Sequence, residues 1–155
     1  MVRPKLIFLF FTVFAISSCW RQMWGDNDLG NNFSLLEGDT VEDRVIVYCS
    51  GRSAGACTGG TFIVPVYSRH MDSTGQYAEY VETAKSNADY IVAKTLLVKD
   101  KTTNYWIINK DFSIVNCDKI NCDSLIQSHV IGPIDKDKFQ KKTSELKINL
   151  NFDDK

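Results

Sequence analysis

Five cysteines are the residues whose type and spacing could support chemistry in this chain. They stand at positions 19, 49, 57, 117 and 122 of 155 residues. A structural zinc site normally uses Cys-x₂₋₄-Cys pairs, whereas seven residues separate Cys49 from Cys57 and four separate Cys117 from Cys122. A thioredoxin-like redox pair needs Cys-x-x-Cys, which does not occur. We therefore expect structural disulfides and no metal or cofactor.

Four of these cysteines flank two turn-like segments, SGRSAGA and DKIN. Four cysteines allow three pairings, and the sequence alone does not choose among them. We favour the local pairing, Cys49 with Cys57 and Cys117 with Cys122, over the rival pairing that joins the two loops to each other. In the chain-entropy model, closing each short loop contributes roughly 2–3 kcal/mol of stability.

The remaining cysteine, Cys19, follows a segment with the layout of an export signal. Arg3 and Lys5 precede an eleven-residue apolar run, residues 6–16, which is too short to cross a bilayer. The run Ile16-Ser17-Ser18-Cys19 resembles the lipobox of bacterial lipoproteins, whose cysteine is acylated. An ordinary secretory signal cut near residues 15–17 is the alternative. Lipid on Cys19 would explain the odd number of cysteines.

The lipobox resemblance implies a protein of the cell envelope with a lipid anchor. A single acyl chain holds only marginally, so stable anchoring needs at least two on Cys19. Trp20 stands where an aspartate would signal inner-membrane retention, which favours the periplasmic face of the outer membrane. We expect residues 1–18 to be a signal peptide, 19–31 the lipidated cysteine and a tether, and 32–155 a single domain.

The charge of the chain argues against nucleic acid as a partner. Without residues 1–18 the chain has 137 residues, 16 of them basic and 19 acidic, for a net charge of −3. Proteins that bind nucleic acid need a basic excess to neutralise phosphates. We expect the membrane, through the lipid on Cys19, and a protein to be its partners.

Catalytic motifs are absent from the sequence. It contains no Gly-x-Ser-x-Gly, His-Glu-x-x-His or Gly-x-x-x-x-Gly-Lys-Ser/Thr pattern. Of the two histidines, His129 opens an apolar segment and is expected at a rim, and His70 lies in a polar segment. We expect no catalytic residue. The candidates for partner contact are Arg52 and Ser53, with Arg52 expected at the tip of the glycine-rich loop, and His70.

Most of the chain has the alternation and β-branched content of strands. Two early strands are expected at 44–49 and 61–67, with Pro65 at an edge or bulge. A three-stranded antiparallel meander is expected from residues 89–99, 104–110 and 112–116. Residues 128–132 could add a further strand.

Two segments have helical spacing. In residues 76–88, Tyr77, Val81 and Ala84 would share one face of a short helix. After Gly132-Pro133, Asp135 is placed to cap a final helix. The expected fold is a small α+β domain: a twisted antiparallel sheet with one or two helices packed on it and disulfide-braced loops.

Five short segments occur in order within residues 29–148: NNFSLL, IVPVY, DYIVAK, NYWIINK and VIGPIDKDKF. Together they resemble a family of small bacterial lipoproteins of unknown function. The family has a Tyr-Ile-x-Ala-Lys strand, a Tyr-Trp-Ile-Ile strand and a Gly-Pro-Leu segment before a capped helix. This chain departs from it with Asn32-Phe33 for Gly-Tyr, two cysteine loops and an insertion at 68–88. The resemblance implies location and fold rather than activity.

These observations lead to one functional expectation with two alternatives. We expect a membrane-anchored, non-enzymatic protein-binding module of the cell envelope, in its specific form an immunity protein or inhibitor of a periplasmic toxin or hydrolase. The alternatives are an assembly or structural lipoprotein and an enzyme whose site is built from residues distant in the sequence. The sequence identifies neither the partner nor the oligomeric state.

Overall fold

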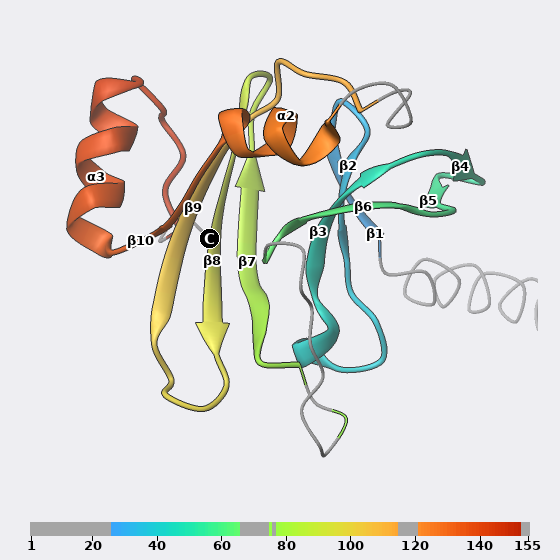
Figure 1. Ribbon diagram of the computed structural model, residues 1–155, viewed down its shortest axis with the longest axis horizontal. Helices are drawn as coiled ribbons and strands as arrows, with labels where there is room; N and C mark the ends of the chain where they lie inside the picture. The colour runs from blue at the N-terminus through green and yellow to red at the C-terminus, as the bar shows by residue number, and fades with distance from the viewer. Residues whose placement is uncertain (1–25, 66–74, 76, 115–120, 153–155) are drawn as a thin grey trace, which may run out of the picture.

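Two four-stranded antiparallel sheets and two helices make up most of the part of the chain that the structure describes (Figure 1). The computed structural model describes residues 26–65, 75, 77–114 and 121–152. The first sheet has the strand order β1-β2-β3-β6. Its strands are β1 (Asp26–Gly30), β2 (Phe33–Leu36), β3 (Val45–Cys49) and β6 (Gly60–Val64). A two-stranded hairpin, β4 (Arg52–Ser53) and β5 (Ala56–Cys57), extends from β3 and β6.

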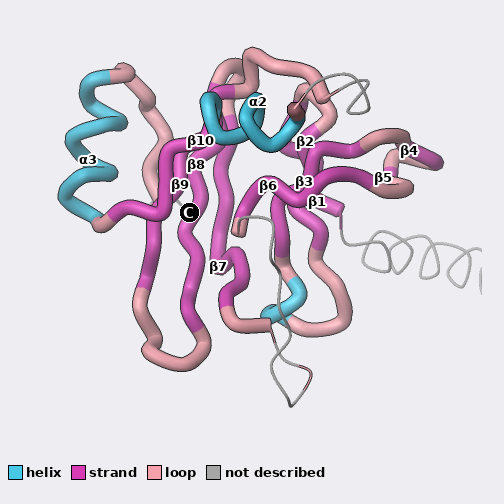
Figure 2. Tube along the Cα trace, in the orientation of Figure 1, coloured by secondary structure: helices cyan, strands magenta, loops and turns pink. Residues whose placement is uncertain are grey.

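The second sheet has the order β10-β9-β8-β7, and all its neighbours are antiparallel. Its strands are β7 (Glu79–Ser86), β8 (Tyr90–Leu97), β9 (Thr103–Asn109) and β10 (Val130–Ile134). Helix α3 (Lys136–Glu145) lies beside this sheet, and α2 (Cys122–His129) lies across one end of the two sheets (Figure 2). A 3₁₀ turn, η1 (Val41–Asp43), precedes β3.

The main core lies between the inner faces of the two sheets. Phe33 and Ile46 from the first sheet and Val81, Ile91 and Ile108 from the second are fully buried in one apolar cluster. Ile126 of α2 belongs to the same cluster, so this helix closes the end of the core. Because each sheet hides an apolar face against the other, neither sheet is expected to be stable alone.

A smaller core lies on the other face of the second sheet. Val92 and Ile107 pack there with Phe139 of α3, and the segment that follows α3 adds Phe152. The rings of Phe139 and Phe152 are stacked with centroids 5.6 Å apart. The second sheet is therefore covered on both faces.

The expected α+β class, with a disulfide-braced loop, is confirmed. Strands were expected at 44–49, 61–67, 89–99 and 104–110, and β3, β6, β8 and β9 occupy these segments as far as they are described. Strand β6 is an edge strand that ends at Val64, immediately before Pro65. The Asp135 side chain caps α3 as expected, accepting a hydrogen bond from the Lys138 amide at 2.8 Å.

The helix expected at 76–88 is wrong, because residues 79–86 form β7. The helix-like spacing of apolar residues in this segment is caused by an irregularity in the pairing of β7 with β8. A β-bulge between Val81 and Thr83 shifts the register, so Val81 and Ala84, three residues apart, both pack against the main core. An extra residue in a strand produces the same i, i+3 apolar pattern as one helical turn.

Three further expectations need correction. The strand expected at 112–116 is not formed over 112–114, where Phe112 and Ile114 pack on the core without pairing. The strand expected at 128–132 begins at Val130 and follows helix α2, which was not expected. Residues 26–30 of the expected tether form β1, so the folded domain begins earlier than residue 32.

Gly132 should be essential for the packing of β10 on β9. A Cβ at this position would overlap the Trp106 ring and lie 2.9 Å from the Tyr105 carbonyl oxygen, and its φ is +149°. We expect Gly132→Ala to lower the free energy of unfolding by about 3 kcal/mol, measured by urea denaturation. Gly55→Ala is the control, because its φ is +88° but nothing lies within 4 Å. Equal losses in the two variants would contradict the steric argument.

Candidate functional site

The β4–β5 hairpin is a short, exposed projection with a defined turn. Arg52 pairs with Cys57 and Ser53 with Ala56. Between them Ala54 and Gly55 have φ values of 50° and 88°, as in the type I′ turns that suit two-residue hairpins. Residues 53–55 are exposed to solvent. The hairpin therefore presents its tip away from the two sheets (Figure 1).

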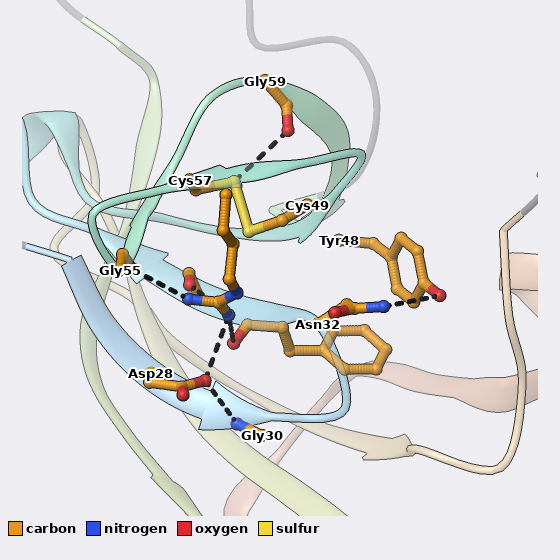
Figure 3. Close-up of a disulfide and its surroundings, with 11 residues drawn as sticks. Asp28, Gly30, Asn32, Tyr48, Cys49, Gly55, Cys57 and Gly59 are labelled. Atoms are coloured by element: carbon orange, nitrogen blue, oxygen red, sulfur yellow. Dashed lines mark hydrogen bonds and ion pairs between the residues drawn. A yellow bond between two sulfur atoms is a disulfide. The ribbon is translucent and has the colours of Figure 1, made fainter.

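A disulfide between Cys49 and Cys57 closes the base of this hairpin (Figure 3). Their Cα atoms are 5.5 Å apart, and Cys49 is the buried last residue of β3. The expected local pairing is thus confirmed for this pair, and closing the loop is worth about 2.5 kcal/mol in the chain-entropy model. Cys122 is also disulfide-bonded. Its expected partner, Cys117, lies outside the described residues, so that pairing stays a prediction.

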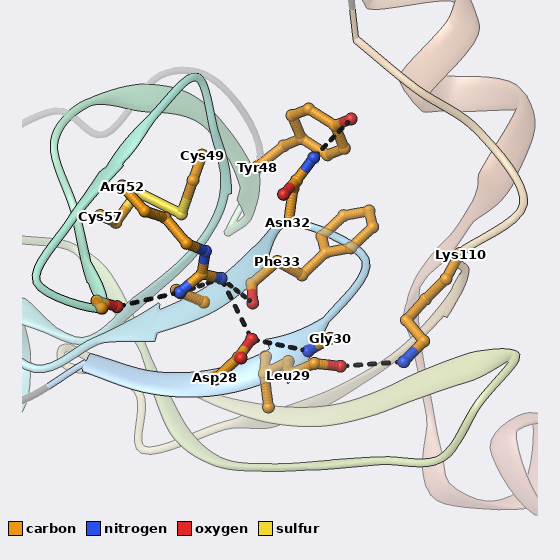
Figure 4. Close-up of polar contacts among 12 residues, drawn as sticks. Asp28, Leu29, Gly30, Asn32, Phe33, Tyr48, Cys49, Arg52, Cys57 and Lys110 are labelled. Carbon is orange, nitrogen blue, oxygen red and sulfur yellow. Dashed lines mark hydrogen bonds and ion pairs between the residues drawn. A yellow bond between two sulfur atoms is a disulfide. The ribbon is translucent and has the colours of Figure 1, made fainter.

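The guanidinium of Arg52 fixes the hairpin to β1 and β2 (Figure 4). Nη2 donates to Asp28 Oδ1 at 3.0 Å, Ser34 Oγ at 3.0 Å and the Phe33 carbonyl at 3.2 Å. Nη1 donates to the Gly55 carbonyl at 3.1 Å. Ser34 is fully buried, so Arg52 also satisfies an interior hydroxyl.

The structure changes the expected arrangement of the partner-contact candidates. Arg52 does not stand at the tip of the loop. Its side chain, 25% exposed, folds back onto the first sheet, and the tip consists of Ala54 and Gly55. Ser53 is exposed beside this tip. His70 and the lipidation candidate Cys19 lie outside the described residues. Only the Arg52–Ser53 pair is therefore placed.

His129, expected at a rim, is held by contacts at the end of α2. Its ring lies 4.7 Å from that of Phe112, centroid to centroid. Nδ1 lies 3.0 Å from the Leu125 carbonyl and 2.9 Å from Ser128 Oγ. These contacts orient the imidazole within the fold.

Tyr48 is a buried phenol with several partners. Its hydroxyl lies 3.0 Å from Ser113 Oγ and receives a 3.4 Å hydrogen bond from Asn32. Burial raises the pKa of Tyr48, but hydrogen bonds from Asn32, Ser113 and the Ile114 backbone outweigh it and lower the pKa overall. The hydroxyl thus ties the β1–β2 turn to the segment after β9.

Lys110 is a buried cation that sequence reasoning missed. The residue is 4% exposed, and its Nζ donates to the Leu29 carbonyl at 2.9 Å (Figure 4). Burial lowers the pKa of Lys110, while the charges of Asp89 and Asp28 oppose that shift. Since Lys110 follows β9 and Leu29 lies in β1, this bond joins the two sheets. The sequence placed Lys110 at the end of the strand expected at 104–110 and gave no sign that it was buried.

A polar depression of about 480 Å³ adjoins Lys110. Asn31, Asp89, Asn109 and Asp111 line part of it. Asn109 Oδ1 accepts a hydrogen bond from the Asp111 amide at 2.9 Å, and the Asp89 carbonyl accepts one from the Lys110 amide at 2.8 Å. These contacts stabilise turns, so we assign no ligand to the depression.

The described part of the chain contains neither a cluster of metal ligands nor a membrane-spanning helix. No group of three or more His, Cys, Asp or Glu side chains among these residues could hold a metal ion. No helix in the same residues has the length and apolar character needed to cross a membrane. Comparison with known proteins found no family model, no curated protein and no solved structure that matches this chain.

The burial of Lys110 should make stability depend on pH. In the unfolded chain its pKa is 10.5, and folding lowers it, so between the folded pKa and 10.5 the unfolded state binds more protons. The free energy of unfolding should therefore rise with pH across that interval. Below the interval, Lys110 should add no pH dependence to the free energy of unfolding. Tyr48, whose pKa is also lowered, acts in the same direction.

Lys110→Met should reduce this rise. The measurement is urea denaturation of both proteins from about pH 7.5 to about pH 10. Lys99→Met removes one exposed lysine and serves as the control for net charge. An equal pH slope in the wild type and Lys110→Met would contradict the role assigned to Lys110.

Proposed function

We propose that this chain is a lipid-anchored, non-enzymatic protein-binding module of the bacterial cell envelope. In its specific form it is an immunity protein or inhibitor that binds a toxin or hydrolase in the periplasm. The anchor is the lipid on Cys19 that the Ile16–Cys19 lipobox suggests. The main observation in support of the binding role is the exposed hairpin β4–β5, which the disulfide closes at its base.

The hairpin supports a binding role because its conformation is already ordered in the free protein. Two-residue strands are too short to hold a hairpin by themselves. Here the Cys49–Cys57 disulfide closes the base, and Arg52 binds the Gly55 carbonyl beside the tip. A loop that is already ordered loses little conformational entropy on binding, so more of the contact energy appears as affinity. The exposed surface at Ser53 is the expected point of contact.

The disulfide also agrees with the proposed location. Disulfides persist in oxidising compartments such as the periplasm and are rare in the cytosol. Six residues separate Cys19 from the start of β1 at Asp26. Even fully extended, six residues span only roughly 20 Å. A lipid on Cys19 would therefore keep the domain close to the membrane surface, and a partner would have to be met there.

Lipidation at Cys19 is tested by metabolic labelling. We expect the wild type to incorporate an alkyne palmitate analogue and to fractionate with membranes, because Cys19 carries the fatty acyl chains of the proposed lipid anchor. Cys19→Ala should lose the label and leave the membrane fraction. Ser18→Ala keeps a small residue before the cysteine and should behave as the wild type. Label retained in Cys19→Ala, or no label in the wild type, would contradict the lipoprotein assignment.

Partner binding is tested by capture with the full chain in mild detergent. Envelope extract and culture fluid from its source are passed over the wild type, over Ser53→Arg and over Gln140→Arg, which adds the same charge on exposed α3. We expect one protein in stoichiometric amount on the wild type and the control. Ser53→Arg should retain about tenfold less, because a bulky charge in the centre of an interface disrupts it.

The identity of the captured protein separates the alternatives. A toxin or hydrolase whose activity the protein suppresses establishes the inhibitor form. Envelope machinery in its place would establish an assembly role instead. Equal capture by Ser53→Arg would remove the hairpin from the interface, and capture of nothing would overturn the protein-binding function.

A further inference from the structure

The outer face of the first sheet, the face turned away from the main core, carries a second exposed feature. Phe62 of β6 is paired with Val47 of β3 on this face, and its side chain is 40% exposed. Leu36 of β2 is paired with Val45, which is buried beneath this surface. An aromatic ring left this exposed on an edge strand provides apolar contact area for another molecule.

A depression of about 390 Å³ lies beside Phe62. It is lined by Leu36, Gly38, Asp39, Asp43, Val45, Phe62 and Tyr77. It thus combines an aromatic wall with two carboxylates. We call it the acidic groove.

Local geometry holds one of the two carboxylates, that of Asp43, in place. A Cβ on Gly38 would overlap the Asp43 side chain, so the glycine lets Asp43 approach the backbone closely. The Thr40 amide donates to Asp43 Oδ2 at 2.8 Å and fixes that carboxylate at the start of η1. Asp39 is exposed and makes no hydrogen bond or ion pair with any described residue.

Around the acidic groove, acidic side chains outnumber basic ones in the described residues of the first sheet. Residues 26–64 contain six acidic residues and two basic ones. Both arginines are engaged with other acids: Arg44 lies 3.6 Å from Glu37, and Arg52 lies 3.0 Å from Asp28. The first sheet therefore presents a negative surface at this end, which favours a positively charged partner.

We infer that the acidic groove binds an arginine side chain of the protein partner. The aliphatic stem would pack on Phe62 and Leu36, and the guanidinium would reach Asp39 and Asp43. A guanidinium suits this combination because it stacks on aromatic rings and forms forked hydrogen bonds with carboxylates. This inference rests on the proposed protein-binding function and adds the chemistry of the partner.

The test uses two fluorescein-labelled peptides and the full chain in mild detergent. One peptide alternates arginine with glycine, and the other replaces each arginine by citrulline, which keeps the shape and removes the charge. Fluorescence anisotropy should show the arginine peptide binding about tenfold more tightly than the citrulline peptide. Equal binding of the two peptides would overturn the inference.

Three variants locate the binding. Asp39→Asn removes a charge that has no described partner, and Phe62→Ser removes the aromatic wall; each should weaken arginine-peptide binding by about fivefold or more. Asp100→Asn removes an exposed charge in the turn after β8 and should leave binding unchanged. Equal loss in Asp39→Asn and Asp100→Asn would mean that net charge alone attracts the peptide, and would overturn the site. Urea denaturation checks that each variant is folded.

The results also separate this inference from the proposed function. If the captured partner binds Asp39→Asn as well as the wild type, the protein-binding function stands and the acidic groove is overturned as its arginine site. If no partner is captured but the arginine peptide binds in an Asp39-dependent manner, the groove is supported and the envelope function fails. A monomer–dimer equilibrium that Phe62→Ser abolishes would show that a second copy covers the groove, and would also overturn the inference.

Discussion

The burial of two apolar sheet faces against each other is the constraint on which the rest of this structure depends. Phe33, Ile46, Val81 and Ile108 have no solvent exposure because they meet in one cluster between the sheets. Burial of side chains of this size is worth about 1.5–3 kcal/mol each. Polar groups at the interface must therefore be satisfied internally. Trp106 Nε1 donates to the fully buried Thr95 Oγ1 at 2.8 Å, and Thr95 donates to Glu79.

Contacts between the sheets extend beyond apolar packing. The Val81 amide donates to the Arg44 carbonyl at 3.0 Å, which joins β7 to the residue before β3. Lys110 donates from the end of β9 to Leu29 in β1. An ammonium buried without a partner would be costly, so its place depends on the Leu29 carbonyl and on the nearby aspartates. The sheets are therefore fixed relative to each other at separate points.

Much of the fold could be predicted because its signals are local. The β-branched runs predicted β3, β8 and β9, and Asp135 predicted the start of α3. The failures came from features that depend on distant residues. The bulge in β7 gave a helical spacing, which only its pairing with β8 explains. Helix α2, which Asn121 caps, is short and was not predicted, because the DKIN segment before it indicated a loop.

The candidate binding surface was predictable only in part. The spacing of Cys49 and Cys57 indicated a closed loop, and the loop is closed. The sequence did not indicate that Arg52 folds back on Ser34, because that contact joins residues 18 apart in the chain. The acidic groove was not visible at all, since β2, the turn before β3 and β6 each contribute to it. Such a site depends on strand register, which a single sequence does not determine.

The hairpin and the acidic groove lie at opposite ends of the same strand. β3 ends at Cys49, where the hairpin is attached, and begins at Val45, which lines the groove. Five residues of strand cover roughly 14 Å. A standard protein interface covers about 800 Å² on each partner, which is wide enough to include both features. Because all five residues of β3 are buried, the spacing between hairpin and groove is fixed by the core. Under the proposed function, one partner would contact both the hairpin and the groove, whose separation the core keeps constant.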